Sequence, residues 1–218
     1  MITVSKEDYL KAILEAECEG EPVIAARLAH WLAVSAPAVT MALRRLKRDR
    51  LVAVRKDGRV ELTAEGRKIA GQLAMRHHLI ERMLHEIFGM AWYQVHDEAE
   101  RLEHAVSSDF EAMLARKLGR AGRCPHGNPA TPESPGVKRK RGLLLLSETQ
   151  PGSRYAVRSV YERDRRLLEF LEQKGIRPGA RLRVHARNYD GTLSLAVESR
   201  RVELGGPAAD RIWVAKAK

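Results

Sequence analysis

Cysteine is nearly absent from this sequence. Only Cys18 and Cys124 among the 218 residues carry a thiol, and neither belongs to a Cys-x-x-Cys pair. A thiolate zinc site of the usual kind needs such pairs, so none is expected here. The two isolated thiols suit a reducing compartment, and we interpret them as unpaired.

Long apolar runs are missing as well. No run approaches the roughly 18 residues of a membrane span, and no signal-peptide pattern opens the sequence. We therefore expect a cytoplasmic protein without a membrane partner. The sequence also lacks a nucleophile-base pair, a phosphate-binding loop and an oxyanion motif, so we expect neither an enzyme nor a protein with a small organic substrate.

Acidic charge is scarce overall but concentrated in one region. The net charge is +11, and residues 27–68 carry eleven Lys and Arg against four acidic residues, whereas residues 77–111 carry eight acidic residues against two basic ones. A basic region followed by an acidic one indicates a face for a polyanion and a face for a cation. Residues 138–218 hold nineteen basic residues against nine acidic ones, an excess that aids solubility or helps to hold a polyanion.

The first 66 residues have the pattern of a winged helix-turn-helix. Apolar positions predict helices near residues 5–18, 23–31 and 35–49, and Ser35 is the expected N-cap of the third. Two short apolar runs at 51–55 and 59–62 flank Asp57-Gly58, which is a strong hairpin signal. The third helix and the hairpin carry many basic side chains, which is typical of a DNA-binding domain.

Two longer helices are expected next, over residues 63–88 and 96–118. Their apolar residues exceed what two helices can bury against each other, so we expect a homodimer interface. Residues 119–136 are rich in Gly, Pro and Ser and break the pattern. Short strands with Gly turns and one helix at 163–174 then predict a compact β-barrel. The expected class is α+β: a winged helix-turn-helix domain (1–66), an all-α metal-binding and dimerisation domain (67–122), a linker (123–141) and an SH3-like β-barrel (142–218).

The segment from His96 to His104 holds a possible half of a metal site. On a helix, Glu100, Glu103 and His104 are spaced at i, i+3 and i+4, so all three project from one face, and His96 lies one turn earlier. The alternative is a solvated acidic face with a structural histidine. The other half of the site has to come from elsewhere in the chain.

At this point the sequence resembles the diphtheria-toxin-repressor family, and within it the manganese transport regulator branch with a C-terminal SH3-like (FeoA-like) domain. The resemblance is spread over nearly the whole chain. The segments that carry it are Glu7-Asp8-Tyr9-Leu10, Ser35-Ala36-Pro37, Met75-Arg76-His77, Glu81-Arg82, His96-Asp97-Glu98-Ala99, Glu103-His104, Gly127-Asn128-Pro129 and Gly175-Ile176-Arg177-Pro178-Gly179.

The resemblance implies two metal sites in this chain. The principal site unites Asp8 with Glu100, Glu103 and His104. An ancillary site corresponds to His77, Glu81 and His96, completed by a residue of the C-terminal domain, for which Glu162 and Asp164 are the candidates. The iron-responsive branch has a thioether and a thiol in place of Asp8 and Glu100. Lys11 stands where some short manganese regulators have a carboxylate ligand, which argues against a two-metal site around the first helix.

The donor atoms of the principal site favour Mn²⁺. Mn²⁺ binds more weakly than the later divalent ions at a given site, so its selection depends on ligand type and geometry. Three carboxylates and one imidazole without sulfur suit Mn²⁺ better than tetrahedral Zn²⁺. Fe²⁺ fits nearly as well, because carboxylate-rich sites separate these two ions poorly.

The resemblance also implies a mechanism in which the metal-loaded homodimer binds double-stranded DNA at a palindromic operator, as a repressor of metal-uptake genes. Without metal, Asp8, Glu100 and Glu103 are expected to repel one another, and a cation would turn this repulsion into bridging. Side chains expected at base edges are those of Ser35, Ala36, Pro37 and Thr40. Side chains expected at phosphates are those of Arg27, Arg44, Arg45, Arg48, Lys56 and Arg59.

Other readings of these residues stay open. Asp8 alone could be a helix-capping carboxylate, and Glu100 with His104 resembles the ligand helix of a di-metal carboxylate enzyme, although no second copy of such a helix is present. A winged-helix regulator without a metal is a third reading, which leaves the acidic segment unexplained. We interpret His126 as structural and the basic run 138–141 as the solvated end of the linker.

Overall fold

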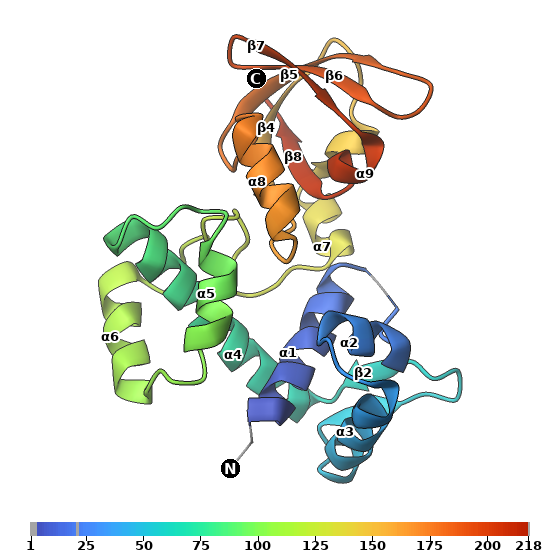
Figure 1. The fold of residues 1–218 in the computed structure, drawn as a ribbon, viewed down its shortest axis with the longest axis vertical. Helices are drawn as coiled ribbons and strands as arrows, with labels where there is room; N and C mark the ends of the chain where they lie inside the picture. Colours follow the sequence, from blue (N-terminus) through green and yellow to red (C-terminus); the bar gives the residue numbers. More distant parts are fainter. Residues whose placement is uncertain (1–3, 21, 218) are drawn as a thin grey trace.

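The computed structural model describes residues 4–20 and 22–217, which form three units (Figure 1). An N-terminal unit contains α1 to α3, a second unit is built from α4 to α6, and a β-rich C-terminal unit lies at the other end of the molecule from α3. Within the described residues, no helix combines the length and the apolar character that crossing a membrane requires.

The N-terminal unit is the predicted winged helix-turn-helix. Its elements are α1 (Val4–Cys18), α2 (Ala25–Trp31), α3 (Ala36–Arg48), β1 (Val52–Val54) and β2 (Val60–Leu62). Ser35 caps α3, because its Oγ accepts a hydrogen bond from the Ala38 amide at 3.3 Å. Leu10, Leu28 and Leu46 come from the three different helices and are fully buried in one core, so α3 is held rigidly on α1.

The wing is a two-stranded antiparallel hairpin in which Val54 pairs with Val60. Gly58 has a φ of +81°, a left-handed conformation that a side chain would strain. The Asp-Gly signal therefore identified the turn correctly. The hairpin tip lies next to α3 in sequence and carries Lys56 and Arg59 into solvent.

The second unit corrects one prediction. Its elements are α4 (Ala64–Arg82), the π-helical turn η1 (Met83–Ile87), α5 (Val95–Leu102) and α6 (Ser108–Leu118). The predicted single helix over 96–118 is therefore two helices. Ser107 caps α6 by accepting a hydrogen bond from the Phe110 amide at 3.2 Å, and Glu103 and His104 lie in the turn before it. The hydroxyl of Ser107 favours a new helix start over continuation of α5.

Part of the apolar surface of this unit is not covered by the described residues. Phe88 is 70% exposed, and it lies with Ile87, Phe110 and Met113 around one shallow groove between the end of η1 and α6. A monomer rarely leaves such neighbouring large apolar side chains in water. We call this set of four residues the apolar groove.

The C-terminal unit consists of one β-sheet accompanied by short helices. Its elements are α7 (Pro135–Lys140), β3 (Leu144–Leu145), η2 (Leu146–Glu148), β4 (Arg154–Val160), α8 (Arg165–Gln173), β5 (Arg181–Arg187), β6 (Leu193–Val197), β7 (Arg200–Leu204), α9 (Gly206–Ala209) and β8 (Ile212–Lys216). The strand order is β3-β8-β4-β5-β6-β7. The β-rich domain was predicted, but over the described residues the end strands β3 and β7 do not pair, so the sheet stays open rather than closing into a barrel.

The segment predicted as a solvated linker is partly ordered. Lys138 lies in α7, is buried, and places its ammonium 5.1 Å from the centre of the Trp213 ring. A cation over an aromatic face is attracted by the ring electrons, so this contact fastens α7 to β8. The interpretation of 138–141 as a solvated end is therefore wrong for Lys138.

Candidate metal centre

The first cluster of possible ligands joins two units of the fold. Asp8 projects from α1, and Glu103 and His104 come from the turn after α5. One ligand atom from each lies within 4.8 Å of the others, and Asp8 Oδ1 is 2.7 Å from His104 Nε2. Asp8 lies inside α1 and faces His104, so it is not a helix cap. We call these three residues the interdomain cluster.

Glu100 lies beside the interdomain cluster but is bound to cations of the protein. Its Oε1 is 3.2 Å from Lys11 Nζ and 3.7 Å from Arg163 Nη1. Burial opposes ionisation, but the charges of Lys11 and Arg163 lower the pKa of Glu100 to about 2. Its carboxylate is therefore ionised and placed within reach of the cluster without being part of it.

Lys11 is a buried cation between the predicted metal ligands. Its side chain is 3% exposed, and its Nζ donates to both carboxylate oxygens of Glu103, at 2.7 and 2.8 Å. Burial disfavours the charged ammonium, but the surrounding carboxylates outweigh it, and the pKa of Lys11 is raised. The repulsion expected among Asp8, Glu100 and Glu103 without metal is therefore largely offset by Lys11, which corrects the simple picture of a loosened apo protein.

A second cluster lies immediately behind Glu103. His77 Nδ1 is 2.7 Å from Glu103 Oε2, and its Nε2 is 3.2 Å from Glu81 Oε1 and 3.1 Å from His96 Nδ1. We call His77, Glu81 and His96 the imidazole cluster; all three are buried. Burial and Lys11 disfavour the charged ring, but Glu81 and Glu103 prevail and raise the pKa of His77 to about 10. The carboxylates of Glu81 and Glu103 therefore stabilise a positive charge at His77.

A third cluster was not anticipated from the sequence. Glu81, Cys124, His126 and Glu162 have ligand atoms within 4.8 Å of one another, and we call them the buried cluster. His126 Nδ1 lies 3.3 Å from Glu81 Oε1 and 3.5 Å from Glu162 Oε2. The Cys124 Sγ is 3.6 Å from Glu162 Oε2. Cys124 is a free thiol, as expected, but it and His126 lie beside two carboxylates, so a thiol stands among the possible ligands.

The hydrogen bonds of His126 prepare its ring for a cation. Its Nε2 donates to the carbonyl of Trp92 at 2.8 Å, and a neutral ring then keeps its lone pair on Nδ1, which points at Glu81 and Glu162. A histidine that ligates a metal is usually held in this way, by a hydrogen bond from its other nitrogen. The chemistry of the donor set in the buried cluster therefore fits a divalent cation.

A glycine explains how the loop carrying Cys124 and His126 reaches this place. Gly127 has a φ of +82°, and a Cβ there would lie 2.0 Å from the carbonyl oxygen of Arg158. Only glycine permits this approach of the loop to β4. The pattern Cys124-x-His126-Gly127 could have suggested a ligand loop, but one thiol and one imidazole two residues apart are a weak signal without a partner.

The two C-terminal candidates have different roles. Glu162 joins the buried cluster, where Asn128 Nδ2 donates to its Oε2 at 2.6 Å. Asp164 is the N-cap of α8, and its Oδ1 accepts a hydrogen bond from the Leu167 amide at 3.0 Å. The structure therefore brings Glu162, and not Asp164, to the other predicted ligands.

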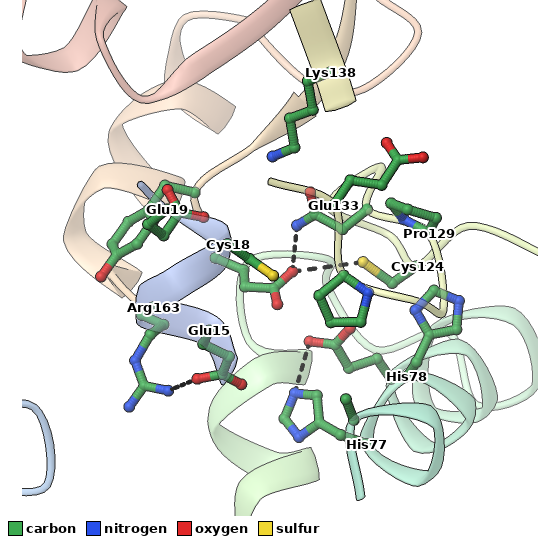
Figure 2. A pocket seen from close by; sticks show the side chains of 16 residues that line it. Glu15, Cys18, Glu19, His77, His78, Cys124, Pro129, Glu133, Lys138 and Arg163 are labelled. Atoms are coloured by element: carbon green, nitrogen blue, oxygen red, sulfur yellow. Dashed lines mark hydrogen bonds and ion pairs between the residues drawn. The ribbon is translucent and has the colours of Figure 1, made fainter. Parts of the chain in front are cut away.

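A cavity of about 70 Å³ borders the buried cluster and connects all three units. Figure 2 shows Cys18 of α1 and Cys124 lining it, with His77 and His78 of α4 on another wall. Arg163 of the C-terminal unit binds Glu15 of α1 at its edge, and its guanidinium lies 5.0 Å from the centre of the Trp31 ring. The C-terminal unit thus contacts α1 and α2 close to the interdomain cluster and the buried cluster.

The predicted DNA-contacting residues lie on exposed surface. Ser35, Ala36, Pro37 and Thr40 form the exposed start of α3, and Arg44 and Arg48 follow on the same helix. Thr40 Oγ1 donates to the carbonyl of Ala36 at 3.0 Å, so its hydroxyl keeps only its acceptor lone pairs for a partner. Met41 of the same helix is also exposed.

The other predicted phosphate contacts are engaged to different degrees. Arg27 donates to the carbonyl of Pro22 at 2.7 Å, and Arg59 lies 3.2 Å from Asp57. Arg45 and Lys56 are exposed. Exposed ion pairs of this kind contribute little, so the arginines can exchange such partners for phosphates at small cost.

Three family descriptions match consecutive parts of the chain. Residues 1–60 match "Iron dependent repressor, N-terminal DNA binding domain", residues 63–132 match "Iron dependent repressor, metal binding and dimerisation domain", and residues 144–216 match "FeoA domain". The iron-dependent repressor IdeR of Mycobacterium tuberculosis is 34% identical over 96% of both chains.

The chain belongs to the iron-dependent repressor family. The diphtheria toxin repressor of Corynebacterium jeikeium is 41% identical over 123 residues, which are 56% of this chain and 51% of that protein. A solved structure described as a manganese-dependent transcriptional repressor in complex with manganese superposes with a TM-score of 0.86 at 35% identity, over 97% of this chain and 100% of that chain.

Membership of the family decides between the readings left open by the sequence. The protein is a metal-dependent, DNA-binding transcriptional repressor and not an enzyme. It binds operator DNA as a homodimer. The predicted class of protein is confirmed, and its metal is a divalent ion.

Proposed function

We propose that the activating ion of this repressor is Mn²⁺, bound by the interdomain cluster. The observation that carries the proposal is the meeting of Asp8 with Glu103 and His104 across two domains. Their oxygen and imidazole donors suit Mn²⁺, and the absence of sulfur disfavours softer ions. Glu100 is the proposed fourth ligand, because its ionised carboxylate needs only to leave Lys11 and Arg163. Fe²⁺ is the second candidate for the same donors.

The proposed ligands connect metal binding to DNA binding through α1. Asp8 lies on α1, which shares one buried core with the recognition helix α3, whereas Glu103 and His104 belong to the dimerisation domain. Ligation of one ion by all three would fix the orientation of α3 relative to the dimer. The recognition helices of a dimer must lie one helical turn of DNA apart, so this orientation controls operator affinity. By linkage, the operator tightens metal binding by the same factor.

We further propose an ancillary ion held by Glu81, with ligands from the imidazole and buried clusters. Glu81 Oε1 faces His77, His96 and His126 at 3.2, 3.2 and 3.3 Å, so Glu81 is common to both sets. Glu162 brings the C-terminal domain to this ion, and the thiol of Cys124 makes the donor set softer than that of the interdomain cluster. Glu81, Cys124 and Glu162 also line the adjoining cavity.

The proposed DNA contacts follow from the exposed face of α3. We propose that Ser35, Ala36, Pro37 and Thr40 meet base edges in the major groove. The basic side chains proposed to contact phosphates are those of Arg27, Arg44, Arg45, Arg48, Lys56 and Arg59. We propose that this binding takes place in the cytoplasm, where the operator lies. Such contacts release counterions, so operator affinity should fall steeply with salt.

The test is operator binding titrated separately with Mn²⁺, Fe²⁺ and Zn²⁺, using a duplex selected from a random-sequence pool with the metal-loaded protein. Asp8→Asn is the informative variant, because it removes the ligand charge while keeping the side chain's shape. Glu103→Ala is less suitable, because it leaves the Lys11 ammonium buried without its closest carboxylate.

We expect Mn²⁺ to strengthen operator binding by a factor of roughly 5 to 150, a typical coupling between two sites, and we expect Asp8→Asn to lose that factor. Glu98→Gln is the control, because Glu98 lies on α5 and pairs with Arg101. Equal operator binding with chelator and with Mn²⁺ would show that the switch proposal is wrong. A full Mn²⁺ response in Asp8→Asn would place the activating ion elsewhere.

A further inference from the structure

Four arginines share one exposed face of the C-terminal sheet. Arg154 of β4 lies directly opposite Arg183 of β5, and Arg181 of β5 lies opposite Ala156 of β4. Continuing across the sheet, Arg183 lies opposite Ala196 of β6, which lies opposite Arg201 of β7. Directly opposed residues point to the same side of a sheet, so the register places all four on one face. We call Arg154, Arg181, Arg183 and Arg201 the arginine plate.

No carboxylate is paired with the plate within the described residues, although Glu203 shares its face and Glu198 lines a pocket with Arg181. Its four guanidinium groups are exposed and form no ion pair or side-chain hydrogen bond there. Glu203, the carboxylate on the same face of β7, accepts a hydrogen bond from Ser194 at 2.7 Å. Like charges directly opposite each other, as in the pair Arg154 and Arg183, destabilise a sheet. An arrangement that costs stability and has no internal partner indicates an external one.

The choice of side chains points to phosphate. All four basic side chains of the plate are arginines, and none is a lysine. The planar guanidinium fork binds phosphate oxygens in pairs, which a lysine ammonium cannot do. Ala156 and Ala196 lie between the arginines, and their side chains are small. The guanidinium groups can therefore approach a flat or convex partner without a steric obstacle from these two residues.

We propose that the arginine plate binds the phosphodiester backbone of a second segment of double-stranded DNA. The plate crosses from β4 to β7, about 14 Å at the usual strand spacing, and therefore spans several phosphates of a duplex. Figure 1 shows β5, β6 and β7 at the end of the molecule away from α3. The plate and the recognition helix thus face different DNA segments, and a repressor dimer on its operator presents two plates to a neighbouring duplex.

The test is a two-duplex capture with the full-length, Mn²⁺-loaded protein. The operator duplex is immobilised and saturated with protein, free protein is washed away, and a labelled duplex without operator sequence is offered. We expect wild-type protein to retain the labelled duplex. Four phosphate contacts predict a salt slope of about −3.6, so retention should fall roughly 150-fold between about 50 and 200 mM salt.

The variant Arg181→Gln with Arg183→Gln should halve that slope and weaken capture at least tenfold at low salt, while operator binding stays unchanged. The matched control is Arg120→Gln with Arg166→Gln, which removes the same charge from exposed arginines outside the plate. Capture that is absent in wild type, or lost equally in the control variant, would overturn the proposal. Retention of labelled polyglutamate instead of the duplex would also overturn it, in favour of an acidic protein partner. Operator binding is read in the same assay, so failure of the plate and failure of the metal switch are distinguishable.

Discussion

The interdomain cluster and the buried cluster differ in burial, donors and connection. Asp8 in the interdomain cluster is 39% exposed at its side chain, whereas Glu81 and His126 in the buried cluster are 1% and 0% exposed. The interdomain cluster offers oxygen and imidazole donors, and the buried cluster adds a thiol. A site of hard donors that joins two domains and has one partly exposed ligand, Asp8, suits exchange of a labile ion, and a buried mixed site suits an ion that stays bound.

The two clusters also differ in how their surroundings shift the pKa of a ligand carboxyl group. Although burial opposes it, His126 and His77 hold the pKa of Glu81 well below its ordinary value. For Asp8, burial outweighs the neighbouring His104 and raises the pKa. Without an ion, the buried cluster therefore depends on protonated imidazoles for its neutrality, whereas the interdomain cluster has Lys11 close to Glu103. Stability should therefore depend on the buried cluster, and regulation on the interdomain cluster.

The largest expected effect is on the stability of the metal-free protein. Glu81→Ala removes the carboxylate that His77 and His126 share, which leaves buried positive charge uncompensated. Its free energy of unfolding in chelator should fall by about 3 kcal/mol, measured by urea denaturation. Asp8→Ala should cost less than about 1 kcal/mol. Glu86→Ala on η1 is the control, and equal losses for Glu81→Ala and Asp8→Ala would remove the contrast between the clusters.

The next effect concerns metal preference. Cys124→Ser replaces a soft donor by a hard one of similar shape, so Zn²⁺ binding at the buried cluster should weaken by roughly 10- to 100-fold while Mn²⁺ activation persists. Competition with a chromogenic chelator measures the Zn²⁺ affinity. Cys18→Ser is the control, because Cys18 lines the same cavity but belongs to none of the clusters. Unchanged Zn²⁺ affinity in Cys124→Ser would exclude the thiol as a ligand.

A smaller effect is expected at Lys11, the internal cation beside the interdomain cluster. Lys11→Met keeps the length of the side chain and removes the competitor for Glu103 and Glu100. We expect Mn²⁺ to bind about tenfold more tightly, because the two carboxylates lose the buried ammonium of Lys11 as a partner and gain more from the ion. Titration followed by electron paramagnetic resonance of free Mn²⁺ measures this. Lys68→Met, on the exposed side of α4, should leave the affinity unchanged, and weaker binding in Lys11→Met would contradict the competition.

The smallest effect separates Glu162 from Asp164. Asp164→Ala removes the N-cap of α8 and should lower the stability of the C-terminal domain by about 1 kcal/mol without changing metal affinity. Glu162→Ala should do the reverse: it should weaken ancillary metal binding and have little effect on α8. Thermal unfolding and calorimetric metal titration of both variants measure the two properties. A metal defect in Asp164→Ala would reverse the assignment.

Local patterns predicted the winged helix-turn-helix and most strands of the C-terminal sheet. Asp57-Gly58 identified the wing, and Ser35 identified the start of α3, because turn and cap chemistry act over a few residues. The helical spacing of Glu100, Glu103 and His104 indicated a ligand face even though the helix ends at Leu102. Glu103 keeps right-handed helical backbone angles as the C-cap, so Glu103 and His104 still lie together, whereas Glu100 is paired with Lys11 and Arg163.

Contacts between distant segments could not be read from local patterns. Nothing near Cys124 or His126 in the sequence shows that Glu81 and Glu162 lie beside them, because the four come from α4, a loop and the end of β4. The sequence showed only that Lys11 stands where some manganese regulators have a carboxylate ligand. Its hydrogen bonds to Glu103 depend on the packing of α1 on α4, which local patterns do not show. The family resemblance supplied the pairing of Asp8 with Glu103 and His104, which spacing alone had left open.

The most direct test of the central claim is anomalous diffraction at the manganese edge from crystals grown with limiting Mn²⁺. We expect the first anomalous peak between Asp8 of α1 and Glu103 and His104 of the turn after α5, and no peak there in Asp8→Asn crystals. A first peak at Glu81, Cys124, His126 and Glu162, with the interdomain cluster empty in a DNA-binding-competent protein, would contradict it.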